Sequence, residues 1–125
     1  MAISQRKSKR KATGGKYRTW RKKKLGELGR LPTLTRIAKR KITKIRVIGA
    51  NSKIKTFFEE TANIYDPKTK KHIKAKIIAV VENPANRNYA RRNIITKGTI
   101  IETDKGKAKV TNRPGQDAGI QAILQ

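Results

Sequence analysis

Residues 73–81 read Ile-Lys-Ala-Lys-Ile-Ile-Ala-Val-Val, with an apolar side chain at every odd position and lysines at positions 74 and 76. A period of two places these two sets of side chains on opposite faces of a β-strand. β-branched residues dominate the sequence around this stretch, because residues 42–125 contain fourteen Ile and four Val but a single Leu. Such a composition favours strands over helices. The stretch therefore predicts an all-β domain that spans residues 42–125.

Short apolar runs on both sides of residues 73–81 predict the other strands of this domain. They lie at residues 44–48, 54–58, 62–65, 94–95, 99–103, 107–111 and 120–124. Turn residues separate them, and the segment Asp66-Pro67-Lys68-Thr69-Lys70 predicts a hairpin. About six short strands at such spacing predict a small closed β-barrel, since closure removes exposed strand edges.

Two segments carry weaker helix signals. Asn83-Pro84 offers an N-cap followed by proline at the first helical position, so residues 84–92 are predicted to form either a short helix or a loop. In a helix, Arg87 and Arg91 would lie on one face, four residues apart. A second helix is equally compatible with the sequence from Leu31 to Ala38. Neither segment changes the all-β assignment.

The first third of the chain has a different chemistry. Residues 1–41 hold sixteen Lys or Arg and one acid, Glu27, which gives them a charge of +15. The whole chain carries +25 and has a pI near 11.2. Its first 24 residues hold eleven Lys or Arg and no acid, so they repel one another, have little to bury and become ordered only against a surface dense in negative charge. We therefore predict a basic extension, residues 1–41, and a β-barrel domain, residues 42–125, with nucleic acid as the partner.

Clustered cations with interleaved glycines and aromatic residues mark the groups that would contact nucleic acid. In the first 24 residues they are Arg6, Lys7, Lys9, Arg10, Lys11, Thr13, Gly14, Gly15, Lys16, Tyr17, Arg18, Trp20, Arg21, Lys22, Lys23 and Lys24. Further along the chain they are Arg30, Arg36, Lys39, Arg40, Lys41, Arg87, Arg91 and Arg113. Arg113 begins a loop rich in Pro and Gly, residues 113–119, which is either an ordinary tight connection or a phosphate contact.

The glycines and aromatics of the extension have two readings. Gly14 and Gly15 would let the backbone approach a phosphate closely, and Tyr17 and Trp20 would stack on unpaired bases. Alternatively, the glycines are simply flexible and the two aromatic rings pack on the barrel. The sequence leaves this choice open, although for Trp20 we favour contact with RNA or an interface.

Other classes of function find less support. A polybasic segment also binds anionic membranes, but we find no lipidation motif and no apolar run of about 18 residues. We expect a soluble protein of the cell interior with no membrane partner. The chain has no Cys, and its one histidine, His72, is expected to be a surface or turn residue. Glu59 and Glu60 would point to opposite faces of a strand, so they would make a poor acid–base pair. Because no catalytic or metal-binding set of residues is visible, we expect no enzyme, cofactor, metal or small-molecule substrate.

Two segments carry a resemblance to a known family. They are RKATGGKYRTWRKKKLGELGR at residues 10–30 and VTNRPGQDAGIQAIL at residues 110–124. With the β-rich sequence between them, the chain resembles the e-type family of small-subunit ribosomal protein eight, which occurs in archaea and eukaryotes. It resembles the short archaeal form, because it lacks the long central insertion and the basic C-terminal extension of eukaryotic members.

The resemblance implies a structural component of the small subunit of the cytoplasmic ribosome. Its partners would be small-subunit rRNA and neighbouring small-subunit ribosomal proteins. The basic residues between Arg6 and Lys24 would then neutralise rRNA phosphates, and recognition would depend mainly on RNA shape and backbone. The residues alone also allow a DNA-compacting or general nucleic-acid-binding protein. An enzyme acting on nucleic acid is the third alternative, which a cluster of carboxylates would favour.

Overall fold

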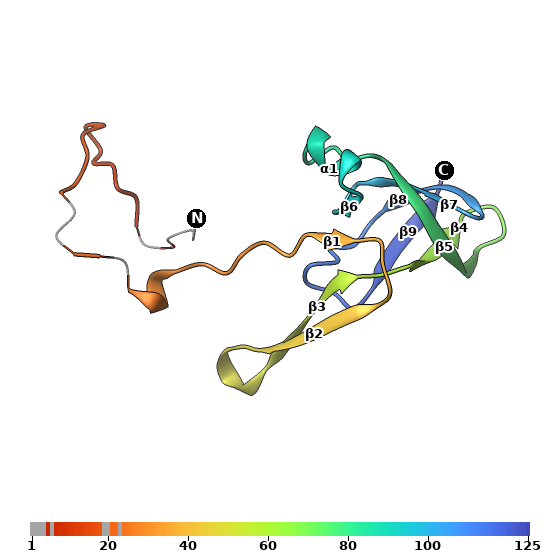
Figure 1. The fold of residues 1–125 in the computed structure, drawn as a ribbon, viewed down its shortest axis with the longest axis horizontal. Coiled ribbons are helices and arrows are strands. Elements are labelled where there is room, and N and C mark those ends of the chain that lie inside the picture. Colours follow the sequence, from red (N-terminus) through yellow and green to blue (C-terminus); the bar gives the residue numbers. More distant parts are fainter. Residues whose placement is uncertain (1–4, 6, 19–20, 23) are drawn as a thin grey trace. The chain divides into compact units, whose positions relative to one another are not determined.

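The strands of this protein form two sheets within residues 33–125, in a computed structural model that describes residues 5, 7–18, 21–22 and 24–125. The chain divides into two compact units, residues 1–32 and residues 33–125. The first unit contains the 3-10 helix η1 (Leu25–Glu27). Figure 1 shows the order of the elements along the chain.

Five strands close into a barrel in the order β4-β5-β7-β8-β9. They are β4 (Thr61–Asp66), β5 (Lys71–Glu82), β7 (Ile100–Thr103), β8 (Gly106–Val110) and β9 (Ile120–Leu124). Consecutive strands are antiparallel, and a parallel pairing of β4 with β9, with Asn63 opposite Gln121, closes the ring. The predicted all-β fold with a small closed barrel is confirmed, with five strands in the barrel where about six were expected.

A second, four-stranded sheet has the order β2-β3-β1-β6. Its members are β1 (Thr35–Arg36), β2 (Lys41–Arg46), β3 (Ser52–Phe58) and β6 (Ile94–Ile95). The strands predicted near residues 44–48 and 54–58 exist, but they pair with each other outside the barrel. The 3-10 helix η2 (Ile48–Ala50) joins them through a turn in which Gly49 has φ +73°.

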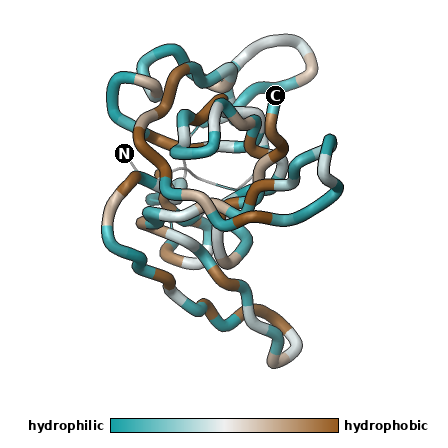
Figure 2. The backbone as a smooth tube through the Cα atoms, turned by 90° about the vertical axis from the view of Figure 1, so that its right-hand side faces the viewer, coloured by the Kyte–Doolittle hydropathy of each residue, from teal (hydrophilic) through white to brown (hydrophobic). Residues whose placement is uncertain are grey.

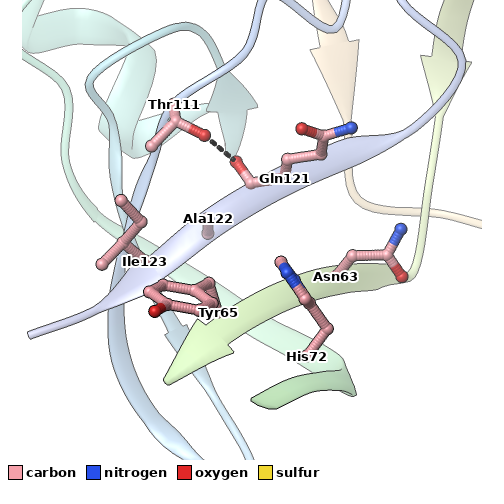
Figure 3. A pocket seen from close by; sticks show the side chains of 7 residues that line it. All are labelled: Asn63, Tyr65, His72, Thr111, Gln121, Ala122 and Ile123. Carbon is pink, nitrogen blue, oxygen red and sulfur yellow. Dashed lines mark hydrogen bonds between the residues drawn. The ribbon is translucent and has the colours of Figure 1, made fainter. Parts of the chain in front are cut away.

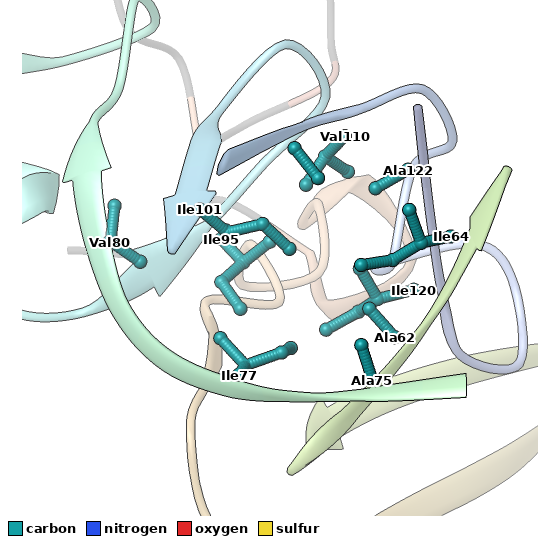
Figure 4. Packing of buried hydrophobic residues seen from close by; sticks show 11 residues of the cluster. Ala62, Ile64, Ala75, Ile77, Val80, Ile95, Ile101, Val110, Ile120 and Ala122 are labelled. Carbon is teal, nitrogen blue, oxygen red and sulfur yellow. The ribbon is translucent and has the colours of Figure 1, made fainter. Parts of the chain in front are cut away.

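The barrel core is built from small and branched side chains. Branched residues such as Ile64, Ile77 and Ile101 pack with Ala75 and Ala122, and Figure 4 shows these side chains converging inside the barrel. Along the barrel strands the inward residues alternate with exposed polar ones, and the tube in Figure 2 changes accordingly between hydrophobic and hydrophilic segments. This alternation is what a narrow barrel filled by side chains requires.

The predicted alternation in residues 73–81 holds only in its middle. Ala75 and Ile77 are buried as expected, but Val80 is 8% exposed whereas Val81 is 45% exposed. The register of β5 against β7 shifts between Ile77 and Ala79 and again between Val80 and Glu82. An extra residue in one strand moves the following side chains to the other face and bends the strand. Placing Val81 on the inner face was therefore wrong, and β5 curves around the core as Figure 4 shows.

Residues 84–92 contain a short helix, α1 (Arg87–Arg91). Its N-cap is Asn86, whose side chain accepts a hydrogen bond from the Asn88 N–H at 2.9 Å, so Asn83 is not the cap. Asn83 is instead buried, donating to the Ile94 carbonyl at 3.0 Å. The second helix considered, from Leu31 to Ala38, does not form, because this segment contains β1. Across the described residues no helix has both the length and the apolar character needed to cross a membrane.

The hairpin predicted at residues 66–70 joins β4 to β5. The Asp66 carboxylate accepts hydrogen bonds from the Lys68 N–H at 2.9 Å and the Thr69 hydroxyl at 2.8 Å. These donors stabilise the charged form and lower the pKa of Asp66 below its usual value. The turn therefore holds this carboxylate against its own backbone.

Candidate nucleic-acid interface

The Thr-Gly-Gly segment of the extension folds into a tight hairpin. The Lys11 N–H donates to the Gly15 carbonyl at 2.7 Å, and the Tyr17 N–H donates to the Lys9 carbonyl at 2.9 Å. Gly14, with φ +84°, occupies the position in the turn where a side chain would be strained. The sequence marked these glycines as flexible or phosphate-approaching, and the structure gives them a role in turning the chain.

The hairpin gathers cations around an exposed aromatic ring. Tyr17 is 48% exposed, and the ammonium groups of Lys7 and Lys11 lie 5.2 and 5.7 Å from the centroid of its ring. The Arg10 guanidinium donates to the Gly14 carbonyl at 2.8 Å, which fixes another cation on the same turn. An accessible ring flanked by ammonium groups can stack on a base while its neighbours contact the phosphates.

Glu27, the one acid among the first 41 residues, is engaged within the extension. Its Oε1 forms an ion pair with Arg21 at 2.5 Å, and its Oε2 accepts from the Lys24 N–H at 3.3 Å. The Glu27 carbonyl also accepts from the Gln5 N–H at 2.8 Å. The carboxylate therefore organises the turn around η1 instead of opposing a polyanion. Three further candidates, Arg6, Trp20 and Lys23, lie outside the described residues.

The other cations predicted in the first unit are exposed, namely Lys16, Arg18, Lys22 and Arg30. The remaining candidates belong to the second unit. Three groups of them attach to the four-stranded sheet. Arg36 lies in β1, and residues 39–41 lead into β2. Arg87 and Arg91 lie on α1, three residues before β6, which pairs with β1. The loop of Arg113 is bound to β3, because the Thr56 N–H donates to the Pro114 carbonyl at 3.0 Å. Positions far apart in sequence thus meet around one small sheet.

Arg40 has a structural partner as well. Its Nε lies 3.2 Å from Oε2 of Glu59, whose side chain is 5% exposed while that of Arg40 is 61% exposed. Among the described residues this carboxylate oxygen has no hydrogen-bond partner, so the ion pair is its main compensation. Sequence reasoning treated Arg40 as a free phosphate ligand and did not detect this pairing.

Arg40→Ala is therefore expected to lower stability, whereas Lys39→Ala next to it is not. Loss of the guanidinium leaves the buried carboxylate of Glu59 without its ion-pair partner. Because Arg40 itself is exposed, we expect the free energy of unfolding to fall by only about 1–2 kcal/mol. Urea unfolding of both variants measures the difference, and Lys39→Ala is the matched control for lost charge. Equal midpoints for the two variants would contradict a structural role for Arg40.

Sequence reasoning missed a second group of cations. Strands β2 and β3 with their η2 turn form a ribbon, residues 41–58, that contains five basic residues and no acid. Four of these were not predicted as contacts: Lys44, Arg46, Lys53 and Lys55. Ile48 at its tip is 95% exposed. The available signal was the absence of acids across these 18 residues, but the prediction of contacts did not use it.

Comparisons with known proteins agree with the features described above. The sequence pattern of the family described as ribosomal protein S8e matches residues 4–125. A protein of Methanocella arvoryzae named small ribosomal subunit protein eS8 is 50% identical over 120 residues, which cover 96% of each chain. Proteins of the same name from Sulfolobus acidocaldarius and Sulfurisphaera tokodaii are 51% and 54% identical, covering 99% and 92% of this chain and 98% and 91% of their own. With a match over nearly its whole length, this chain belongs to the ribosomal protein S8e family.

Proposed function

We propose that this protein is a structural, non-catalytic component of the small ribosomal subunit that binds and stabilises small-subunit rRNA. The observation that carries the proposal is the charge of residues 1–41, where sixteen cations face one acid and that acid is held by Arg21. Membership of a ribosomal protein family supports rRNA, among nucleic acids, as the polyanion that the chain binds. Its other partners would be neighbouring small-subunit proteins on the cytoplasmic ribosome.

The binding mechanism we infer is neutralisation of phosphates by two basic regions. The extension supplies the hairpin around Tyr17, and the 33–125 unit supplies the cations around the four-stranded sheet. Each phosphate contact releases a counterion, so the affinity falls steeply with salt. Contacts of this kind read the shape and backbone of folded RNA and carry no direct sequence information. The division of the chain into a basic rRNA-binding extension, residues 1–41, and a β-barrel domain, residues 42–125, is part of this proposal.

A competition titration at physiological salt and magnesium tests the proposal. Labelled small-subunit rRNA is bound to the full chain and displaced by duplex DNA or by unrelated structured RNA of equal length. We expect the labelled rRNA to remain bound in the presence of at least a tenfold excess of competitor. Its protected nucleotides should cluster at a few sites. An unstructured Lys/Arg peptide of the same charge gives the baseline. Displacement by duplex DNA or unrelated RNA as readily as by unlabelled rRNA would favour the alternative, a general nucleic-acid-binding or DNA-compacting protein.

A further inference from the structure

A pocket of about 420 Å³ opens on the outer face of the barrel, and none of the predicted nucleic-acid contacts lines it. Asn63 and Tyr65 from β4, His72 from β5 and Gln121 and Ile123 from β9 line it. The strand register explains this grouping, because Tyr65 pairs with both His72 and Ile123, and Asn63 pairs with Gln121. Their neighbours Ala62, Ile64 and Ile120 point into the core, so these five side chains point outward. Ala122, which also lines the pocket, is buried.

One side of this outer pocket is aromatic and apolar. The rings of Tyr65 and His72 lie 5.1 Å apart between centroids at an angle of 45°, and Figure 3 shows them side by side. Ile123 adds an aliphatic surface that is 42% exposed. Single exposed apolar residues are common, but here one adjoins two rings in a concave site. The volume falls within the range of about 300–1,000 Å³ typical of small-ligand sites.

The other side of the pocket presents amide groups. The side chains of Asn63 and Gln121 are exposed and form no hydrogen bond with any residue that the structure describes. Each amide offers two donors and an acceptor at one edge of the site. In Figure 3 they lie on adjacent strands, and Asn63 is next to His72. A planar ligand stacked on the rings would meet these groups with its polar edge.

Cations flank the pocket on two sides. Lys74 lies opposite Asn63 on β5, and Lys109 lies opposite Ile123 on β8. Both lysines are exposed. The nearby acid Asp66 is bound by its own turn through Lys68 and Thr69. A planar ligand attached to phosphates fits this arrangement better than an acidic or purely apolar segment of a protein.

We propose that the outer pocket binds one nucleobase that is extruded from folded RNA. The base would stack on Tyr65 and His72, hydrogen-bond with its edge to Asn63 and Gln121, and place its flanking phosphates near Lys74 and Lys109. Sequence-specific recognition of RNA uses unpaired bases in this way, on aromatic side chains and polar groups. The inference rests on the proposed function for RNA as the partner, and it adds base recognition to binding that otherwise reads phosphates.

The test uses a short RNA hairpin with a single-nucleotide bulge that carries A, C, G, U or an abasic ribose. All five RNAs have the same charge, so phosphate contacts cancel. We expect the full chain to bind the preferred base at least about fivefold more tightly than the abasic RNA, the lower end for one stacked base. His72→Ala should bring this ratio close to one. Gln121→Ala should alter which base is preferred, and Gln116→Ala on an exposed loop is the matched control.

Each other outcome overturns the proposal. A wild-type ratio near one means that the pocket does not bind a base. A ratio that persists in both His72→Ala and Gln121→Ala places the stacking elsewhere, for example on Tyr17. If His72→Ala and Gln121→Ala keep full base discrimination but the variant subunits lose a neighbouring ribosomal protein, the occupant is a protein segment and not a base. His72 and Gln121 are exposed, so folding is retained and is checked by circular dichroism. Failure of the proposed function shows separately, as equal competition by rRNA and duplex DNA.

Discussion

Removal of residues 1–32 is expected to leave residues 33–125 folded while the affinity for small-subunit rRNA falls by about a thousandfold or more at low salt. The deletion takes away twelve Lys or Arg and one acid. If about half of these cations contact phosphate, their loss makes the slope of log K against log salt shallower by about 4. The contribution to affinity is large, because six to ten such contacts change the affinity by about three to five orders of magnitude over moderate changes of salt. Filter binding across a salt series measures both quantities.

The folded state of the shortened chain follows from where the core lies. Every buried residue in the described part of the chain, beginning with Thr35, belongs to residues 33–125. The barrel closes through the pairing of β4 with β9, neither of which needs the first unit. We therefore expect residues 33–125 and the full chain to have similar thermal midpoints. Their free energies of unfolding should differ by no more than about 1 kcal/mol.

A full-length variant separates charge from fold in this experiment. Replacing Lys7, Lys9, Lys11, Lys16 and Lys22 with Gln keeps the length of the extension and should reproduce a large part of the loss. The corresponding replacement of Lys68, Lys70, Lys71, Lys105 and Lys107, at or beside the β4–β5 and β7–β8 turns, is the control for total charge. Unchanged rRNA binding after the deletion would contradict a binding role for the extension. The main interface would then lie in the 33–125 unit.

The barrel was predictable because its signal is local. Alternation in residues 75–77 and the turn at Asp66 act within a few residues, and both are found, the first in β5 and the second in the hairpin before it. The bulges after Ile77 were not predictable, since they arise from the curvature that closure imposes on a twelve-residue strand. Patterns of apolar residues mark which segments are strands, but they do not mark where a strand gains a residue.

Strand pairing was the second limit. Residues 41–58 and 61–82 have the same kind of alternation, yet the first forms a ribbon and the second forms barrel strands. Which strands pair depends on contacts between distant segments, such as Arg36 with Phe58, that leave no local trace. The same applies to the candidate sites. Single cations were identified by charge, whereas the Arg40–Glu59 pair requires two segments distant in sequence to meet and the outer pocket requires at least three.

Thr56 connects the loop of Arg113 to the sheet. Its side chain is fully buried, and its hydroxyl donates to the Asp117 carbonyl at 2.9 Å while accepting from the Gly119 N–H at 2.8 Å. The Thr56 carbonyl in turn accepts from the Thr35 hydroxyl at 2.7 Å. One threonine of β3 therefore holds the loop between β8 and β9, which the sequence left open as an ordinary connection or a phosphate contact.

Thr56→Val is expected to destabilise the protein by about 2–4 kcal/mol, because it removes the hydroxyl with little change of shape and leaves two backbone groups without their partner. Urea unfolding measures the loss, and amide exchange at Gly119 should accelerate in the native state. Thr56→Ser keeps the hydroxyl and should recover most of the stability, while Thr43→Val, at an exposed position of β2, should have almost no effect. If the loop orders Arg113 for rRNA, Thr56→Val and Arg113→Ala will also lower affinity by similar factors. A stable Thr56→Val variant with slow exchange at Gly119 would show that the loop is held by other contacts, and Arg113 would then owe its position to the backbone of Pro114.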